Sequence, residues 1–160
     1  GIAPGINRHF SGENLPFIPK SVWREARDEA RSMIKTDADF LGMGFDIDES
    51  CVELTKQNAK IAGVDKYIRA EKRDIRDFTV PKSPVKIITN PPYGERMLEL
   101  SEARELYGIL GSRVLPLGDN SLYVITPDEE FESVFGLKAT KNRKLYNGMM
   151  KARLYIYNGR

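Results

Sequence analysis

The feature that most constrains the fold is an alternation of strand-like and helix-like segments in the middle of the chain. The apolar run at 40–46 predicts a short buried strand, and the segments 67–72 and 85–89 are also typical of short strands. The stretch between the first two has apolar residues at helical spacing, begins at the capping residue Asp48 and stops at Gly63. Strands that alternate with helices in this way predict an α/β fold with a mostly parallel sheet.

Further elements are predicted on both sides of this unit. Residues 1–20 contain prolines and glycines without a sustained period, so we expect an extended loop there. Asn147-Gly148 lies between two strand-like runs, which is a strong signal for a closing antiparallel hairpin. The remaining predicted elements are a helix over 21–35 with Ser21 as its N-cap, a helix over 101–115, a strand over 121–125, a short helix opened by Thr126-Pro127-Asp128, and hairpin strands over 141–146 and 152–157.

Composition limits the class of protein. A chain of 160 residues with a net charge of +2 is long enough for one domain with a hydrophobic core. With one cysteine, Cys51, and one histidine, His9, the chain cannot form an internal disulfide or a metal site of several cysteines or histidines. No apolar stretch reaches the roughly 20 residues of a membrane span, so we expect no membrane contact and a reducing, cytoplasmic setting.

Polar residues follow all three central strands, and ligands of open α/β sheets bind at the carboxyl ends of strands. Asp46 ends the first strand, and its carboxylate could accept two hydrogen bonds from the ribose of an adenosyl cofactor. The alternative is that Asp46 and Asp48 compete to cap the following helix. Asp74, after the second strand, could accept from the amine of the cofactor's adenine, or it could pair with Arg73 or Arg76.

The third strand is followed by Asn90-Pro91-Pro92-Tyr93, a motif suited to methylation of a base amine. Such an amine is a poor nucleophile because its lone pair is delocalised into the ring. The Asn90 side-chain oxygen and the Pro91 carbonyl could each accept one amine hydrogen, which directs the lone pair toward an incoming methyl group. The prolines fix the backbone, and Tyr93 offers a flat face for an extruded base. The alternative is a proline-rich turn.

The end of the chain is basic. No acidic residue follows Glu132, and the interleaved Tyr146, Tyr155 and Tyr157 could stack on bases while the cations contact phosphates. The alternative is a solvated terminal hairpin. The basic residues are Lys138, Lys141, Arg143, Lys144, Lys151, Arg153 and Arg160.

In order and spacing, these motifs resemble the THUMP-associated RNA methylase family, which includes bacterial guanine-N2 methyltransferases of large-subunit ribosomal RNA. The resemblance covers nearly the whole chain. The stretches that carry it are Ala3-Pro4-Gly5-Ile6-Asn7-Arg8 with Phe10, Gly44-Phe45-Asp46-Ile47-Asp48, Asn58-Ala59 with Ala62-Gly63-Val64, Arg73-Asp74, Ile87-Ile88-Thr89-Asn90-Pro91-Pro92-Tyr93-Gly94-Glu95-Arg96, and Lys144-Leu145-Tyr146-Asn147-Gly148.

The resemblance implies a Rossmann-like class I methyltransferase fold, S-adenosylmethionine as cofactor and a base exocyclic amino group in RNA as substrate, with guanine N2 of large-subunit ribosomal RNA as the expected target. It assigns the cofactor ribose to Asp46 and the adenine to Asp74. Ile47, Ile75 and Asn90 are included among the expected cofactor-binding residues. The resemblance assigns binding of the target base to Asn90, Pro91, Pro92 and Tyr93.

One part of the family pattern has no counterpart here: the Asp-Pro-x-Cys-Gly-Ser-Gly-Thr loop and the first strand before it. We therefore expect residues 1–20 to form an extended loop that leads into a partial methyltransferase catalytic domain over 21–160. The remainder of a parent polypeptide, including that strand, the glycine loop and a THUMP domain, is an expected partner, and the chain alone is expected to be inactive. Because that strand is central in this fold, the strands ending at Asp46 and Asn90 should not pair with each other.

Two other functions fit the same residues. The Asn-Pro-Pro-Tyr chemistry serves adenine equally well, so a DNA adenine-N6 methyltransferase is one alternative. The segment Lys144-Leu145-Tyr146-Asn147-Gly148 and the opening loop favour the RNA family. A non-catalytic RNA-binding module that retains the fold is the other alternative.

Overall fold

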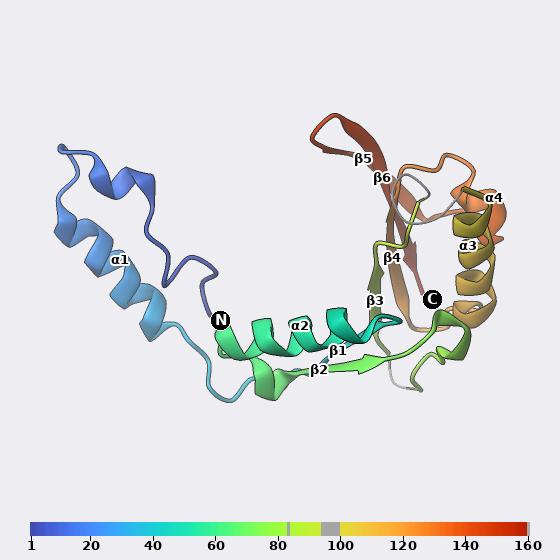
Figure 1. Cartoon of the computed structure of the whole chain (residues 1–160), viewed down its shortest axis with the longest axis horizontal. Helices are drawn as coiled ribbons and strands as arrows, with labels where there is room; N and C mark the ends of the chain where they lie inside the picture. Colours follow the sequence, from blue (N-terminus) through green and yellow to red (C-terminus); the bar gives the residue numbers. More distant parts are fainter. Residues whose placement is uncertain (83, 94–99, 160) are drawn as a thin grey trace. The chain divides into compact units, whose positions relative to one another are not determined.

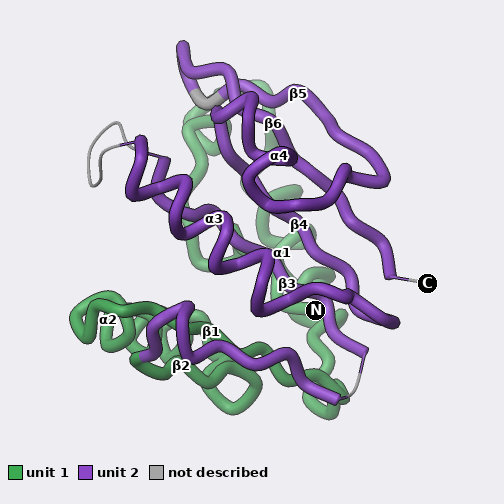
Figure 2. Tube along the Cα trace, turned by 90° about the vertical axis from the view of Figure 1, so that its right-hand side faces the viewer, with its two compact units in different colours: residues 1–72 green, residues 73–160 purple. Residues whose placement is uncertain are grey.

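The computed structural model describes residues 1–82, 84–93 and 100–159. It divides into two compact units, residues 1–72 and residues 73–160, which Figure 2 draws in different colours.

Unit 1 contains a two-stranded parallel sheet joined by a helical crossover. Its strands pair from Gly42 opposite Ile68 to Asp46 opposite Lys72. Its elements are η1 (Ser11–Asn14), α1 (Lys20–Ser32), β1 (Gly42–Asp46), α2 (Glu49–Ile61), η2 (Asp65–Tyr67) and β2 (Ile68–Lys72) (Figure 1).

The crossover helix α2 begins and ends at the predicted residues. The Asp48 carboxylate accepts hydrogen bonds from the backbone N–H and the hydroxyl of Ser50, both at 2.8 Å, and so caps the helix. Gly63 follows the C-cap with a φ of +68°, a conformation that glycine adopts without strain. Val52 and Ala59 are buried, so one stripe of α2 faces its own unit's core.

Three expectations for unit 1 need correction. Helix α1 starts one residue before Ser21, with Pro19 as an N-cap that makes no side-chain hydrogen bond, so Ser21 does not cap it. The opening segment is not wholly extended, because the Glu13 carboxylate accepts from the N–H of Phe10 and holds the 3-10 turn η1. The strand at 40–46 was expected to be buried, but β2 and α2 leave Met43 and the preceding Leu41 about half exposed.

Unit 2 is built on a four-stranded mixed sheet in the order β3-β4-β6-β5. Strands β3 and β4 are parallel, and the other two neighbouring pairs are antiparallel. Its elements are η3 (Ile75–Asp77), β3 (Lys86–Thr89), α3 (Leu100–Val114), β4 (Ser121–Thr126), α4 (Phe131–Phe135), β5 (Lys141–Asn147) and β6 (Met150–Asn158). The α/β class and the closing antiparallel hairpin are therefore confirmed.

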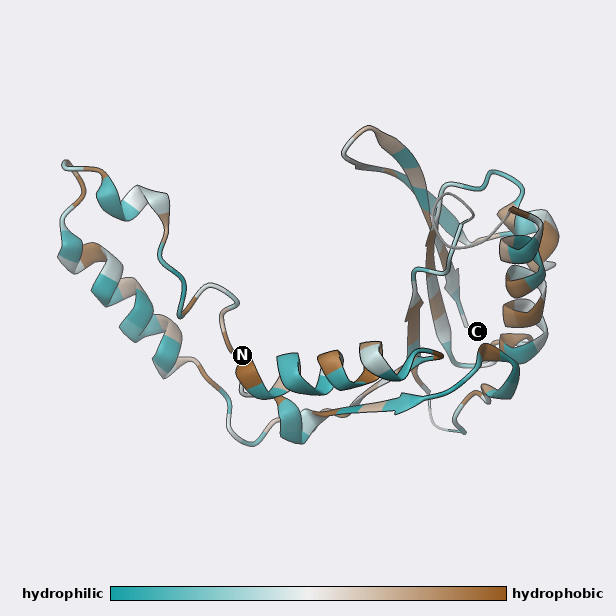
Figure 3. Ribbon diagram, in the orientation of Figure 1, coloured by the Kyte–Doolittle hydropathy of each residue, from teal (hydrophilic) through white to brown (hydrophobic). Residues whose placement is uncertain are grey.

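The core of unit 2 lies between this sheet and the two helices α3 and α4. Alternate residues of β4 point into it, and Leu122, Val124 and Thr126 are fully buried. The brown colour of hydrophobic residues stands out along the ribbon of β3, β4 and α3 in Figure 3. The aromatic part of the core consists of Tyr107, Phe131, Phe135, Tyr155 and Tyr157, with Phe131 in ring contact with three of the others.

Two boundaries in unit 2 differ from the sequence-based expectation. The short helix starts at Phe131 and not at Thr126-Pro127-Asp128, because Thr126 and Asp128 instead accept backbone hydrogen bonds in the loop. The hairpin turn consists of Gly148 and Met149, one residue later than predicted. Gly148, the first residue of the turn, has a φ of +62°, whereas Met149 is not among the described residues with a positive φ, a combination that fits a type II′ turn.

The strands β1 and β3 belong to different units, and each has a strand partner within its own unit. Strand β1 pairs with β2, and β3 pairs with β4. The expectation that the strands ending at Asp46 and Asn90 form no common ladder concerns strands of two different units, and it stays a prediction.

Candidate active site

The loop Asn90–Tyr93 leaves the carboxyl end of β3, as predicted. Parallel pairing with β4 brings Thr89 opposite Val124 and fixes the point at which the loop starts. Asn90 is exposed, whereas Pro91, Pro92 and Tyr93 are half-buried. Asn90 is thus an exposed residue at the edge where ligands of such sheets bind.

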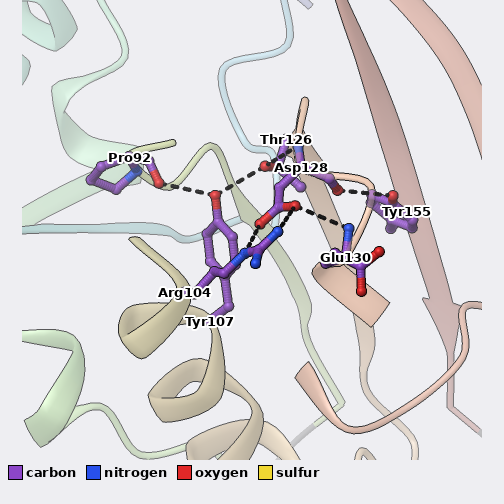
Figure 4. Close-up of polar contacts among 7 residues, drawn as sticks. All are labelled: Pro92, Arg104, Tyr107, Thr126, Asp128, Glu130 and Tyr155. Carbon is purple, nitrogen blue, oxygen red and sulfur yellow. Dashed lines mark hydrogen bonds and ion pairs between the residues drawn. The ribbon is translucent and has the colours of Figure 1, made fainter. Parts of the chain in front are cut away.

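The loop is attached to the core by a hydrogen bond from Tyr107. The phenol of Tyr107, a fully buried residue of α3, donates to the carbonyl oxygen of Pro92 at 3.1 Å (Figure 4). The same phenol oxygen lies 3.0 Å from the hydroxyl of Thr126, the last residue of β4. Burial raises the pKa of the Tyr107 phenol, so it keeps its proton and remains a donor at neutral pH.

Behind Thr126, an ion pair fixes the loop that follows β4. The Asp128 carboxylate, only 5% exposed, accepts from Arg104 Nε at 2.8 Å and from a terminal guanidinium nitrogen at 2.9 Å. These bonds hold the pKa of Asp128 below its usual range. The backbone carbonyl of Asp128 accepts from Tyr155 at 3.2 Å, and its N–H donates to Thr126 at 3.2 Å.

Asp46 has the freedom expected of a binding residue. One carboxylate oxygen accepts from the N–H of Asp48 at 2.9 Å, and the other has no hydrogen bond among the described residues. Asp48 is the residue that caps α2, and its hydrogen bonds from Ser50 lower the pKa of its carboxyl. The two aspartates therefore make different contacts, since Asp48 caps α2 and Asp46 accepts from the N–H of Asp48, and Ile47 between them is 63% exposed.

Asp74 makes the local pairing that was the alternative to adenine binding. Its carboxylate accepts from the Arg76 N–H at 2.8 Å and from the Arg76 guanidinium at 3.1 Å, which caps η3. The backbone bond and then the side-chain bond lower the pKa of Asp74. Ile75 is half-buried and packs against the core of unit 2.

The structure groups the predicted site residues by unit. Asp74, Ile75 and the loop Asn90–Tyr93 lie in unit 2, while Asp46 and Ile47 lie in unit 1. The continuation of the motif, Gly94-Glu95-Arg96, lies outside the described residues.

Two of the three tyrosines in the basic stretch cannot stack on RNA bases. Tyr155 and Tyr157 are 2% and 1% exposed, because their antiparallel neighbours on β4 face the same core. Tyr146 is 68% exposed, as a stacking residue must be. Its cross-strand partner is Lys151, and the pair Lys144 and Arg153 lies on the same face of the hairpin.

The sequence-based interpretation missed the residues that support the loop, namely Arg104, Tyr107, Thr126 and Asp128. A signal was present for Tyr107, because it shares the apolar face of its helix with Ala103, Leu110 and Val114, and a buried tyrosine hydroxyl needs a partner. Thr126 is the polar residue that ends β4, the strand paired with β3. It could have been recognised from the same signal as Asp46, Asp74 and Asn90, a polar residue at the carboxyl end of a strand.

Neither a multi-ligand metal cluster nor a membrane-spanning helix is found in the part of the chain that the structure describes. It contains no cluster of three or more histidine, cysteine, aspartate or glutamate side chains placed to hold a metal ion. Its helices also include none with the length and apolar character that crossing a bilayer requires.

Comparison with known families matches residues 1–156 to the RMKL-like methyltransferase domain. YpsC of Bacillus subtilis, which carries a provisional RNA methyltransferase name, is 38% identical over 156 residues. The ribosomal RNA large subunit methyltransferase K/L of Shewanella frigidimarina is 35% identical over 161 residues. Each match includes 98% of this chain, which spans 40% of the length of the first relative and 23% of the second.

Solved structures are similar over 99% of the chain. One is a provisionally named methyltransferase, SMU.472, in complex with SAH, with a TM-score of 0.92 and 37% identity. Another, from Listeria monocytogenes, is described as a predicted N6-adenine-specific DNA methylase, with a TM-score of 0.87 and 40% identity. The chain spans 42% and 41% of these two proteins.

Proposed function

Because this chain belongs to the RMKL-like methyltransferase domain family, we propose that the full-length protein transfers a methyl group to a base exocyclic amine in RNA, in a cytoplasmic setting. The specific target we propose is guanine N2 of large-subunit ribosomal RNA. One observation carries the proposal: an exposed asparagine at the carboxyl end of β3 opens a loop whose backbone is fixed by two prolines and by Tyr107.

The chemistry follows from what this loop can accept. The Asn90 side-chain oxygen and the Pro91 carbonyl each accept a hydrogen bond from one N–H of the target amine, which turns its lone pair away from the ring system. A fixed backbone keeps both acceptors in place before the base arrives, so no reorganisation is needed during transfer. The half-buried Tyr93 supplies a surface for stacking of the extruded base.

The residues present fit S-adenosylmethionine, which supplies the methyl group when bound. Asp46 is the residue suited to the ribose. One of its carboxylate oxygens accepts from the N–H of Asp48, and the second can accept from a ribose hydroxyl. Ile47 beside it is exposed and apolar. Asp74 and Ile75 are proposed for the adenine, where Asp74 must keep or exchange its bonds to Arg76.

The hairpin supports RNA as the substrate. Lys144, Tyr146, Lys151 and Arg153 lie on one face of β5 and β6, and the Glu129 carboxylate pairs with both Lys151 and Arg153. Cations around an exposed aromatic ring suit a nucleic acid backbone with unstacked bases. We propose this face as an RNA contact.

Other parts of the full-length protein are proposed partners of this chain. The relatives named above are more than twice as long as the region matched. Within the described residues, β1 and β3 each have one edge without a strand partner. Unpaired backbone groups are costly when buried, so we propose that further segments cover these edges.

A second candidate function is methylation of adenine N6 in DNA. The description of the Listeria monocytogenes structure favours it, and the loop chemistry serves adenine equally well. Methyl transfer from radiolabelled S-adenosylmethionine to purified large-subunit ribosomal RNA and to duplex DNA separates the two. We expect label in the RNA, as N2-methylguanosine after digestion. Label confined to DNA adenine would replace the first proposal with the second.

A further inference from the structure

A series of hydrogen bonds links Asp128 through Thr126 and Tyr107 to the loop Asn90–Tyr93. Only one assignment of donors and acceptors along this series is possible. The backbone N–H of Asp128 can only donate, here to Thr126, and the Pro92 carbonyl can only accept, here from Tyr107. The Tyr107 hydroxyl has one hydrogen, and it uses this hydrogen to donate a hydrogen bond to the Pro92 carbonyl. Thr126 must therefore donate to the Tyr107 oxygen at 3.0 Å. The Asp128 N–H, the Thr126 hydroxyl and the Tyr107 hydroxyl are therefore three donors in series, and each polarises the next. The last of them donates to the Pro92 carbonyl.

The prolines extend this anchoring to the neighbouring carbonyl. Between the carbonyls of Pro91 and Pro92 lie a planar peptide bond, the ring-fixed φ of Pro92 and its ψ. Holding the Pro92 carbonyl restricts ψ, which is the one soft torsion of the three. The N–H of Tyr93 belongs to the same peptide group as that carbonyl, so the start of Tyr93 is restrained as well.

We infer that Tyr107 is a positioning residue: by donating to the Pro92 carbonyl, it sets the direction of the Pro91 carbonyl and the approach of Tyr93 to the target base. Thr126 supports this role by supplying the hydrogen bond that Tyr107 accepts. The inference rests on the proposed function, since it names what aligns the acceptors of the same site. Tyr107 itself is fully buried, so we assign it no direct contact with cofactor or base.

The chain offers a closely matched control in Tyr157. Tyr157 is also a core tyrosine, 1% exposed, and donates to a backbone carbonyl at the same 3.1 Å, that of Leu137. Its burial removes it from any stacking surface. Tyr107→Phe and Tyr157→Phe therefore delete the same atom from similar surroundings, and only the first deletion touches the active-site loop.

The test compares these variants and Thr126→Val in the full-length protein. We measure kcat for RNA methylation, the Kd for S-adenosylmethionine, the thermal midpoint and the hydrogen exchange rate of the Tyr93 amide. Small misplacements of reacting groups cost about 10- to 100-fold in rate, so we expect a kcat loss of that size in Tyr107→Phe and a smaller loss in Thr126→Val. Cofactor Kd should change by less than about twofold. Exchange at Tyr93 should accelerate in Tyr107→Phe but not in Tyr157→Phe.

The outcomes separate this inference from the proposed function. If the wild type methylates RNA but Tyr107→Phe and Tyr157→Phe have equal kcat, the positioning role is overturned and the proposed function stands. If the wild type methylates no RNA, the proposed function falls, and Tyr93 exchange still decides whether Tyr107 anchors the loop. Equal exchange rates in both tyrosine variants would overturn the anchoring itself. A loss of kcat in Tyr107→Phe with similar thermal midpoints in both variants supports positioning over general destabilisation.

Discussion

The guanidinium group of Arg104 binds the carboxylate of Asp128 through two hydrogen bonds, of 2.8 and 2.9 Å, and so joins helix α3 to the loop that follows β4. The Asp128 pKa is lowered in the folded protein, chiefly by this contact. A carboxyl with a lowered folded pKa stabilises the fold at pH values above its unfolded pKa of about 3.9. That contribution is lost as the pH falls through the folded pKa.

The first prediction uses this pH dependence. We expect Asp128→Asn to lower the midpoint of denaturant-induced unfolding at pH 7, because it leaves Arg104 without its charged partner. The difference from wild type should shrink steadily as the pH falls below about 4, where wild-type Asp128 begins to be protonated as well. Unfolding midpoints measured from pH 7 to pH 2.5 test this. A difference that stays constant across that range would mean that the carboxylate charge is not what stabilises the contact.

The second prediction concerns two glycines of α3. A methyl group at Gly111 would overlap the backbone carbonyl of Phe135 in α4, whereas at Gly108 the nearest neighbouring atom would be 3.9 Å away. Gly108→Ala should stabilise the protein by up to about 1 kcal/mol through helix propensity. Gly111→Ala should destabilise it by about 1–3 kcal/mol because α3 and α4 must separate. Chemical denaturation of both variants measures this, and equal effects at the two positions would contradict the described packing.

The third prediction is that Asp46 binds the ribose of the cofactor. Hydrogen bonds to a charged acceptor contribute about 1.5–3 kcal/mol each, so Asp46→Ala should raise the Kd for S-adenosylmethionine at least about tenfold in calorimetry. Glu53→Ala is the control, because it removes an exposed carboxylate of the same unit that pairs with Lys56 on α2. That control should bind normally. Unchanged affinity in Asp46→Ala would move the role to Asp48 or remove it from both.

The fourth prediction distinguishes the two faces of the hairpin. Lys144 lies on the same face as Tyr146, and the adjacent Arg143, also exposed, points to the other face. Lys144→Ala should weaken RNA binding uniformly across sequences and reduce the salt slope of binding by about one. Arg143→Ala should leave the slope nearly unchanged. Binding curves for both variants at several salt concentrations provide the comparison, and equal slopes would argue against one RNA-contacting face.

Local signals predicted much of the fold. Asp48 and Gly63 mark the ends of α2 through capping preferences that act over a few residues, and Gly148 marks the hairpin through its positive φ. The position of Asn90 after β3 follows from an apolar run that ends in a polar residue. These features depend on near neighbours in the chain, so they are visible in the sequence alone.

Features set by tertiary contacts could not be predicted in the same way. Both faces of β6 carry apolar or aromatic residues, so alternation does not show that Tyr155 and Tyr157 point inward; their pairing with β4 decides it. The partners of Tyr107 lie 15 and 19 residues away along the chain, which no local pattern reveals. Asp74 is a similar case, because cofactor binding and helix capping require the same residue at the same strand end.

The central claim is that Asn90 holds the target amine, and Asn90→Ala in the full-length protein tests it most directly. Removing one preorganised acceptor typically lowers the rate by about 10² to 10³. We therefore expect kcat for methyl transfer to ribosomal RNA to fall by that factor, while calorimetry shows S-adenosylmethionine affinity within about twofold of wild type. An Asn90→Ala enzyme that methylates RNA within about threefold of the wild-type rate would contradict the account.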